Sequence, residues 1–166
     1  MRAFPGLESA LVVGIGNPFR GDDAAGLQVV RHIARVNPPA VQTWESDGDV
    51  GTLLDLWSNR KFVVAVDAVS SGSPPGAVFR YEMTDESEEL PAMLGSTVSS
   101  HGLGLGEAVK LGSALGRLPK RLIIYGIEGV NFDTGAPLSR SVADAAVTAA
   151  SGILADLDDR VANQDA

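Results

Sequence analysis

The sequence predicts an α/β fold, a three-layer sandwich in which a mostly parallel, twisted sheet of about five strands carries helices on both faces. Two observations favour this fold class. Short apolar runs typical of strands alternate along the chain with segments whose apolar residues recur at helical spacing. The clearest run, FVVAV over 62–66, is apolar throughout, as expected of a strand covered on both faces. No repeat or linker divides the chain, so we expect a single domain over 1–166 with its core at about 11–157.

In the first half of the chain, apolar runs predict strands and amphipathic segments predict helices. The first run is bracketed at its end by Gly14 and Gly16, where a backbone can turn sharply or pass close to another segment. The first helix should end near Asn37, because the proline that follows disfavours helical geometry in that residue. The second helix is anchored by leucines and a tryptophan at helical spacing. The expected strands are 11–15, 40–44 and 62–66, and the expected helices are 24–36 and 50–57.

The second half adds two strands and two helices. Alternating apolar and polar side chains over 76–82 predict an edge strand or a hairpin-like strand. A helix is expected over about 103–115, and the apolar run at 121–127 predicts the last strand. The closing helix is expected over 139–157, and the polar tail from Asp158 is expected to fray.

Composition and charge exclude several classes of function. The formal net charge is −8, which argues against a nucleic-acid partner, because proteins that bind polyanions cluster Lys and Arg. The chain has no cysteine, so disulfides, thiolate zinc sites, iron–sulfur clusters and a cysteine nucleophile are excluded. No apolar run approaches membrane-spanning length, and the start of the chain has no signal-peptide core. We therefore expect a soluble, cytoplasmic protein with no membrane partner.

Two adjacent acids, Asp22 and Asp23, lie where the first strand gives way to the first helix. One of them can cap the helix, because a short carboxylate accepts the free N–H groups of the first turn. The helix needs only one cap, and ligands bind at this edge of open α/β sheets, so the other acid is a candidate for chemistry. The spacing alone leaves the cap and the functional acid equally plausible.

Asp67 directly follows the predicted strand at 62–66. A carboxylate in that place is either a cap for a turn or a functional acid at the carboxyl end of the strand. Burying an unpaired acid is costly, so Asp67 should have a partner. We favour a functional role, because the position matches that of Asp23 at the end of the first strand.

His101 lies at the junction between a loop and a predicted helix, a better place for a metal ligand than that of His32 within the first helix. With Asp23 and Asp67 it forms a set of two oxygen donors and one nitrogen donor that suits a borderline divalent metal. Such a set leaves coordination positions open for water or substrate. Nickel, zinc, manganese and iron are all compatible with it.

Two other patterns are weaker. Asp47 and Asp49 resemble the start of a calcium-binding loop, but no Glu falls at the required later position. The glycines at 102, 104 and 106 do not have the spacing of a dinucleotide-binding fingerprint, which also requires a preceding strand.

Several stretches together resemble the hydrogenase maturation endopeptidases. GIGNPFRGDDAAG looks like the amino-terminal motif of that family, FVVAVDAV followed by PGAVFR like its second acidic motif, and SSHGLGLGEAVKL like its histidine motif. LSRSVADAAV in the closing helix fits the carboxyl-terminal pattern, as does GIEG, although the common form has Pro after the acid or Gln. We assign no role to Glu128 in that motif. The resemblance runs over about 11–157, and the order and spacing of the motifs make it specific.

The resemblance implies a peptide-bond hydrolase, compatible with an aspartic-type classification, that removes the carboxyl-terminal extension of a nickel–iron hydrogenase large-subunit precursor after nickel insertion. By motif, Asp23, Asp67 and His101 are the catalytic and metal-contacting residues, the first being Glu or Asp in the family. The metal is then nickel supplied by the precursor rather than a permanent cofactor. Whether that nickel polarises the carbonyl, activates water or only positions the chain stays open, as does a carboxylate acting as general base. We expect a monomer whose partner is the precursor.

Two alternatives have other functions. A non-catalytic nickel-binding maturation chaperone could use the same three ligands, and only a cleavage assay separates it from a protease. The GxGNP pattern after the first strand also resembles peptidyl-tRNA hydrolase. That family has a Thr-Arg-His-Asn run soon afterwards, which is absent here, and its basic RNA-binding surface conflicts with a net charge of −8.

Overall fold

The computed structural model describes residues 9–84, 92–96 and 104–164. Within them, five strands form one sheet in the order β2-β1-β3-β5-β4. The neighbours β2, β1, β3 and β5 pair in parallel, and β4 pairs antiparallel with β5 at one edge. The strands are β1 (Ala10–Ile15), β2 (Val41–Ser46), β3 (Phe62–Val69), β4 (Val78–Thr84) and β5 (Arg121–Glu128).

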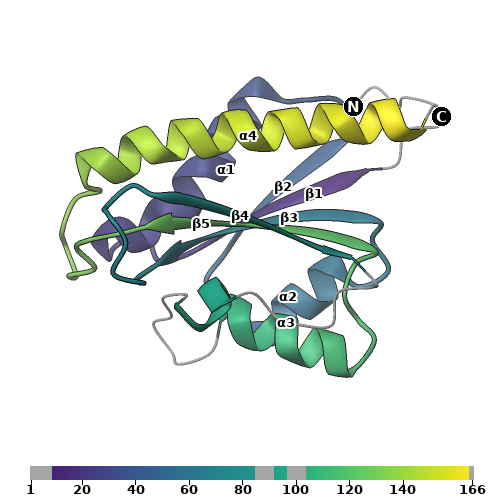
Figure 1. Ribbon diagram of the computed structural model, residues 1–166, viewed down its shortest axis with the longest axis horizontal. Helices are drawn as coiled ribbons and strands as arrows, with labels where there is room; N and C mark the ends of the chain where they lie inside the picture. Colours follow the sequence, from purple (N-terminus) through teal and green to yellow (C-terminus); the bar gives the residue numbers. More distant parts are fainter. Residues whose placement is uncertain (1–8, 85–91, 97–103, 165–166) are drawn as a thin grey trace.

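Helices cover both faces of the sheet (Figure 1). Two of them pack together on one face, and the other two pack together on the opposite face. The first pair is α1 (Ala25–Val36) and α4 (Arg140–Gln164), and the second is α2 (Val50–Trp57) and α3 (Leu105–Ala114), with the 3₁₀ turn η2 (Ala92–Ser96) contacting α3. The predicted α/β class and the mostly parallel five-stranded sheet between two helical layers are confirmed.

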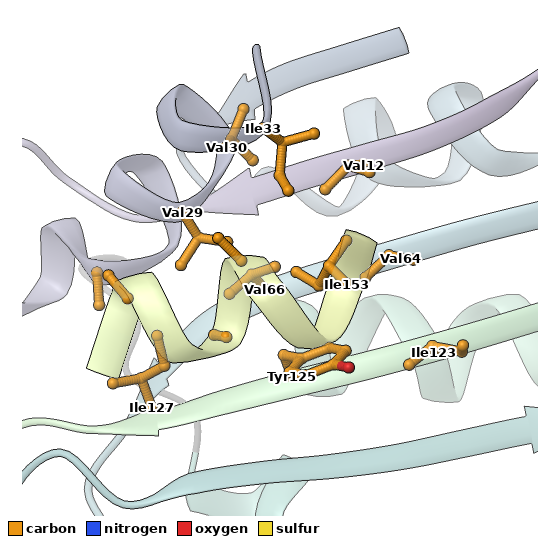
Figure 2. Close-up of a cluster of buried hydrophobic side chains, with 14 of the residues drawn as sticks. Val12, Val29, Val30, Ile33, Val64, Val66, Ile123, Tyr125, Ile127 and Ile153 are labelled. Atoms are coloured by element: carbon orange, nitrogen blue, oxygen red, sulfur yellow. The ribbon is translucent and has the colours of Figure 1, made fainter. Parts of the chain in front are cut away.

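Successive residues of the central strands point into two different cores. Val12 and Val64 pack with Ile153 of α4 beneath the first pair of helices (Figure 2). Their neighbours Val13 and Val63 pack into the second core, beneath α2 and α3. Strands that are buried on both faces carry apolar side chains at every position, which explains the continuous apolar runs in the sequence.

The sheet order places a topological switch point between β1 and β3. The chain leaves β1 through α1 to reach β2 on one side, whereas β3 pairs with β1 on the other side. In open α/β sheets, ligands bind outside the carboxyl ends of the strands at such a point. Gly26 brings α1 close to it, since a Cβ there would collide with the carbonyl oxygens of Ile15 and Val66.

β3 and α4 are both longer than the sequence predicts. β3 continues to Val69 because β5 pairs with it in register as far as Glu128, so Asp67 lies within the strand rather than after it. α4 continues to Gln164, and the expected fraying from residue 158 is wrong. Arg160 helps to explain the extension, because its side chain is buried against the segment that precedes β2.

The strand expected at 76–82 is an edge strand, but it forms no hairpin with β3. β4 pairs with β5 instead, although α3 lies between them in the sequence. No helix in the described residues is both long enough and apolar enough to cross a membrane.

Candidate functional site

Asp23 and Asp67 both lie at the carboxyl edge of the sheet, where β1 and β3 end. Asp67 belongs to β3 and is paired in register with Gly126 of β5. Asp23 belongs to the 3₁₀ turn η1 (Gly21–Ala24), which folds back over the end of β1. Gly16 permits that return, because it has a φ of +155° and a Cβ there would collide with the carbonyl oxygen of Asp23.

In each of the two carboxyl groups, one oxygen accepts a hydrogen bond from a backbone N–H, and the other has no hydrogen-bond partner among the described residues. Oδ2 of Asp23 accepts a hydrogen bond from the Asn17 N–H at 3.1 Å and lies 3.9 Å from Nη1 of Arg20. Oδ1 of Asp67 accepts one from the Ala68 N–H at 2.8 Å. The remaining oxygens, Oδ1 of Asp23 and Oδ2 of Asp67, are buried and have no hydrogen-bond partner among the residues that the structure describes. Buried polar atoms are normally satisfied, so this pair of orphan oxygens calls for a ligand.

Burial and mutual repulsion both disfavour the charged forms of these acids. Burial raises the pKa of Asp23, and the nearby Arg20 and the Asn17 N–H offset only part of that effect. The pKa of Asp67 lies well above its ordinary value, first because the group is buried and second because of the charge of Asp23. A bound cation would relieve both effects, since it stabilises the two charged carboxylates together. The pair therefore fits a divalent metal that carries open coordination positions.

Asp22 has a structural role that the sequence did not reveal. Its carboxylate accepts hydrogen bonds from the N–H groups of Val130, Asn131 and Ser139 and from the Ser139 hydroxyl, at 2.7–3.0 Å. Burial raises the pKa of this group, but these four bonds outweigh burial and hold the pKa below its ordinary value. Asp22 thus anchors the segment between β5 and α4 to the end of β1.

Neither of the adjacent acids Asp22 and Asp23 is a helix cap. The turn η1 and helix α1 both begin without a hydrogen bond from a capping side chain. The sequence offered no signal for the actual partners of Asp22, because they lie more than 100 residues away along the chain.

Glu128, which the sequence left without a role, ends β5 and is buried. Its carboxylate accepts hydrogen bonds from the N–H groups of Ser71 and Gly72 and from the Ser71 hydroxyl. These bonds hold the loop that follows β3, on the same edge as Asp67. The sequence does contain a signal for a role of Glu128, because it is an acid at the end of a buried strand, as Asp67 is.

His101 lies outside the described residues, so its place in the site stays a prediction. In the described part of the chain, no group of three or more His, Cys, Asp or Glu side chains is placed to hold a metal ion. The carboxylate of Asp49 caps α2 by accepting from the Thr52 N–H, and Asp47 accepts from the Asp49 N–H. That turn therefore has a structural explanation without calcium.

Comparison with known proteins places the chain in one family. The model of the hydrogenase maturation protease family matches residues 12–156. The hydrogenase 2 maturation protease of Escherichia coli is 30% identical over 120 residues, which cover 70% of this chain and 71% of that protein. The hydrogenase expression/formation protein HupD of Thiocapsa roseopersicina is 33% identical over 126 residues. That match covers 74% of this chain but only 55% of HupD.

Solved structures agree with the sequence comparison. The hydrogenase maturating endopeptidase HybD from E. coli superposes with a TM-score of 0.74 at 26% identity, covering 91% of this chain and 93% of that one. The maturation protease HycI from Thermococcus kodakarensis gives a TM-score of 0.64 at 26% identity and covers 90% and 92% of the two chains. The structural matches cover about nine tenths of this chain and the family model covers residues 12–156, so a peptidyl-tRNA hydrolase is no longer a competing interpretation. This chain belongs to the hydrogenase maturation protease family.

Proposed function

We propose that this protein is an endopeptidase that removes the carboxyl-terminal extension of a nickel–iron hydrogenase large-subunit precursor after nickel has been inserted. Asp23, Asp67 and His101 would complete the coordination of a nickel ion that the precursor already holds through its cysteines. The observation that carries the proposal is the pair of buried carboxyl groups at the switch point, each with one unpaired oxygen.

The geometry of the two carboxyl groups suits this role. The N–H groups of Asn17 and Ala68 each hold one oxygen and so fix the orientation of the two side chains. Their other oxygens, which are unpaired among the described residues, remain available to a metal ion. Ligands held in advance by hydrogen bonds bind a metal with less loss of conformational freedom. The nickel would thereby dock the scissile peptide beside the acid pair.

Nickel that arrives with the substrate fits the composition of the site. Two carboxylates and one imidazole, without cysteine, form a sparse ligand set compared with the sets that retain structural metals. When bound, the nickel supplies Lewis acidity next to the scissile bond. Asp23 and Asp67, whose pKa values are both raised, are the candidates for a general base that accepts a proton from an attacking water.

The metal dependence of cleavage tests this proposal. We expect the purified protein to carry little tightly bound metal, to cleave nickel-loaded precursor and to leave nickel-free precursor intact. Release of the extension is measured by mass spectrometry, and the metal content of the protein by elemental analysis. An ordinary metalloprotease would instead lose activity with a chelator and regain it with added metal on either form of the precursor. Cleavage of nickel-free precursor by metal-loaded protein would refute the substrate-nickel mechanism, and an uncut loaded precursor that still binds would indicate a chaperone.

Asp23→Asn tests whether that acid is a ligand. An amide oxygen is a poorer ligand than a carboxylate for such a cation, so processing of nickel-loaded precursor should fall by about tenfold or more. The fold should survive, because the raised pKa shows that burial already disfavours the negative charge at this position. The matched control is Asp144→Asn on the exposed face of α4, which should process the precursor at the parental rate. If Asp23→Asn itself processes the precursor at the parental rate, Asp23 is not a metal ligand and only positions the turn.

A further inference from the structure

Phe19 and Val130 are exposed apolar side chains at the same edge of the sheet as the acid pair. Phe19 is 74% exposed and Val130 is 60% exposed, the largest fractions among the large apolar side chains of the described residues. Phe19 lies in the segment between β1 and α1, and Val130 lies just after β5. Both segments emerge at the left side of the molecule in Figure 1, where the parallel strands end.

Hydrogen bonds join these two segments into one unit. The Gly135 N–H donates to the carbonyl oxygen of Phe19 at 2.8 Å, and the Asp22 N–H donates to the carbonyl oxygen of Asn131 at the same distance. The Val130 N–H donates in turn to the Asp22 carboxylate at 2.9 Å. The backbone beneath both exposed side chains is therefore fixed by the same cluster of bonds.

The backbone of Phe19 is held on both sides while its ring faces solvent. Its carbonyl accepts from Gly135, and its N–H donates to Oδ1 of Asn17 at 2.9 Å. The N–H of that same Asn17 holds the carboxylate of Asp23. Because these hydrogen bonds already fix the backbone of Phe19, less conformational entropy is lost when its side chain contacts a partner.

We propose that Phe19 and Val130, hereafter the apolar pair, bind an apolar segment of the hydrogenase precursor and so determine substrate affinity. This inference rests on the proposed function. Asn17 links Phe19 to Asp23, since it accepts from the Phe19 N–H and donates to the Asp23 carboxylate, and Val130 donates to Asp22, the neighbour of Asp23 in the chain. Both apolar side chains are therefore anchored to the turn that carries Asp23, to which the precursor would bring its nickel. Two or three ligands to one ion recognise a metal but not a particular protein, whereas buried apolar anchors supply affinity and selectivity. The remaining exposed large apolar side chains of the described residues lie elsewhere, on β2, near α3, at the end of α1 and on α4.

The test is the dependence of cleavage rate on precursor concentration, using nickel-loaded precursor and the full chain. Phe19→Ser and Val130→Ser should each raise the half-saturating concentration about tenfold, which corresponds to the loss of one buried apolar anchor. Phe19→Leu should restore most of the affinity, because it restores an apolar contact. Val147→Ser is the matched control, since Val147 is 53% exposed on α4, and it should leave the half-saturating concentration unchanged. Thermal unfolding of each variant should match the parent, because all three side chains are exposed.

Each outcome has one meaning. If the parent cleaves the precursor and both serine variants show the parental half-saturating concentration, the apolar pair is not a substrate contact. The same conclusion follows if these variants change only self-association, as measured by sedimentation velocity, because the pair would then bind a second copy of the chain. If one serine variant unfolds early, the other serine variant carries the test, judged against Val147→Ser. If the parent itself leaves the loaded precursor uncut, the proposed function fails instead.

Discussion

Asp67→Asn is expected to reduce processing of nickel-loaded precursor by about 100-fold or more while making the unliganded protein more stable. The loss of processing follows from replacing a carboxylate with a neutral amide at a proposed nickel ligand. The gain in stability has a different cause, because the substitution removes an acid that folding places in a buried site beside Asp23. A side chain that is retained for function at the expense of folding shows this combination.

The stability gain should depend on pH in a defined direction. The folded protein raises the pKa of Asp67 well above the value of 3.8 found in an unfolded chain. Below about pH 3.8 the acid is protonated in both states, so Asp67→Asn and the parent should differ least there. As the pH rises above that value, folding must either keep the proton or bury the charge, and the parent loses stability relative to the variant until the folded pKa is passed. Urea unfolding in the presence of a chelator, at several pH values, measures this difference.

At neutral pH we expect the variant to gain about 1 kcal/mol or more in free energy of unfolding, because the neutral amide neither takes up a proton nor buries a charge when the chain folds. The control is the same substitution at an exposed acid, Asp133→Asn, which should change neither the stability nor the processing rate. A variant that is less stable than the parent at neutral pH would mean that the carboxylate of Asp67 has a stabilising partner in the unliganded protein.

Asp22→Asn should instead destabilise the fold by about 3–5 kcal/mol. An Asn side chain presents one acceptor oxygen and an NH₂ group to four donors that now share two carboxylate oxygens. At least one backbone N–H would be left unpaired, and hydrogen bonds to a charged group are the stronger kind. The measurement is denaturant unfolding at neutral pH, where the depressed pKa keeps Asp22 fully ionised in the parent.

A graded series separates the charge of Asp22 from its contacts. Ser139→Ala removes only the hydroxyl donor and should lower the free energy of unfolding by about 1 kcal/mol. Asp133→Asn, on the exposed part of the same segment, should stay within about 0.5 kcal/mol of the parent. If Asp22→Asn were as stable as Asp133→Asn, the segment after β5 would not depend on the Asp22 carboxylate.

The layers of the fold could be predicted because they follow from local patterns. Runs such as 62–66 require burial on both faces, and the helical periodicity of the intervening segments supplies the cover. The end of α4 could not be predicted in this way, since residues 158–164 are mostly polar and the contact that Arg160 makes with Pro39 and Ala40 joins segments about 120 residues apart. The pairing of β4 with β5 rather than β3 is likewise a long-range choice that alternation alone does not encode.

The acids at the sheet edge illustrate the same limit. Asp23 and Asp67 were identified because strand ends at a switch point are predictable places for ligands. The distinction between Asp22 and Asp23 was not available, because it depends on N–H groups of a segment more than 100 residues away. Glu128 received no role in the sequence analysis, since the loop that it holds is brought to it only when β3 and β5 pair.

The central claim, that the acid pair binds nickel carried by the precursor, is tested most directly by nickel K-edge X-ray absorption. Nickel-loaded precursor is measured alone and after rapid mixing and freezing with an excess of the protein. We predict that the nickel gains oxygen and nitrogen ligands on binding while its sulfur ligands remain, and that the gain in oxygen ligands is smaller with Asp67→Asn. An unchanged nickel coordination shell in a complex that goes on to be cleaved would contradict the claim.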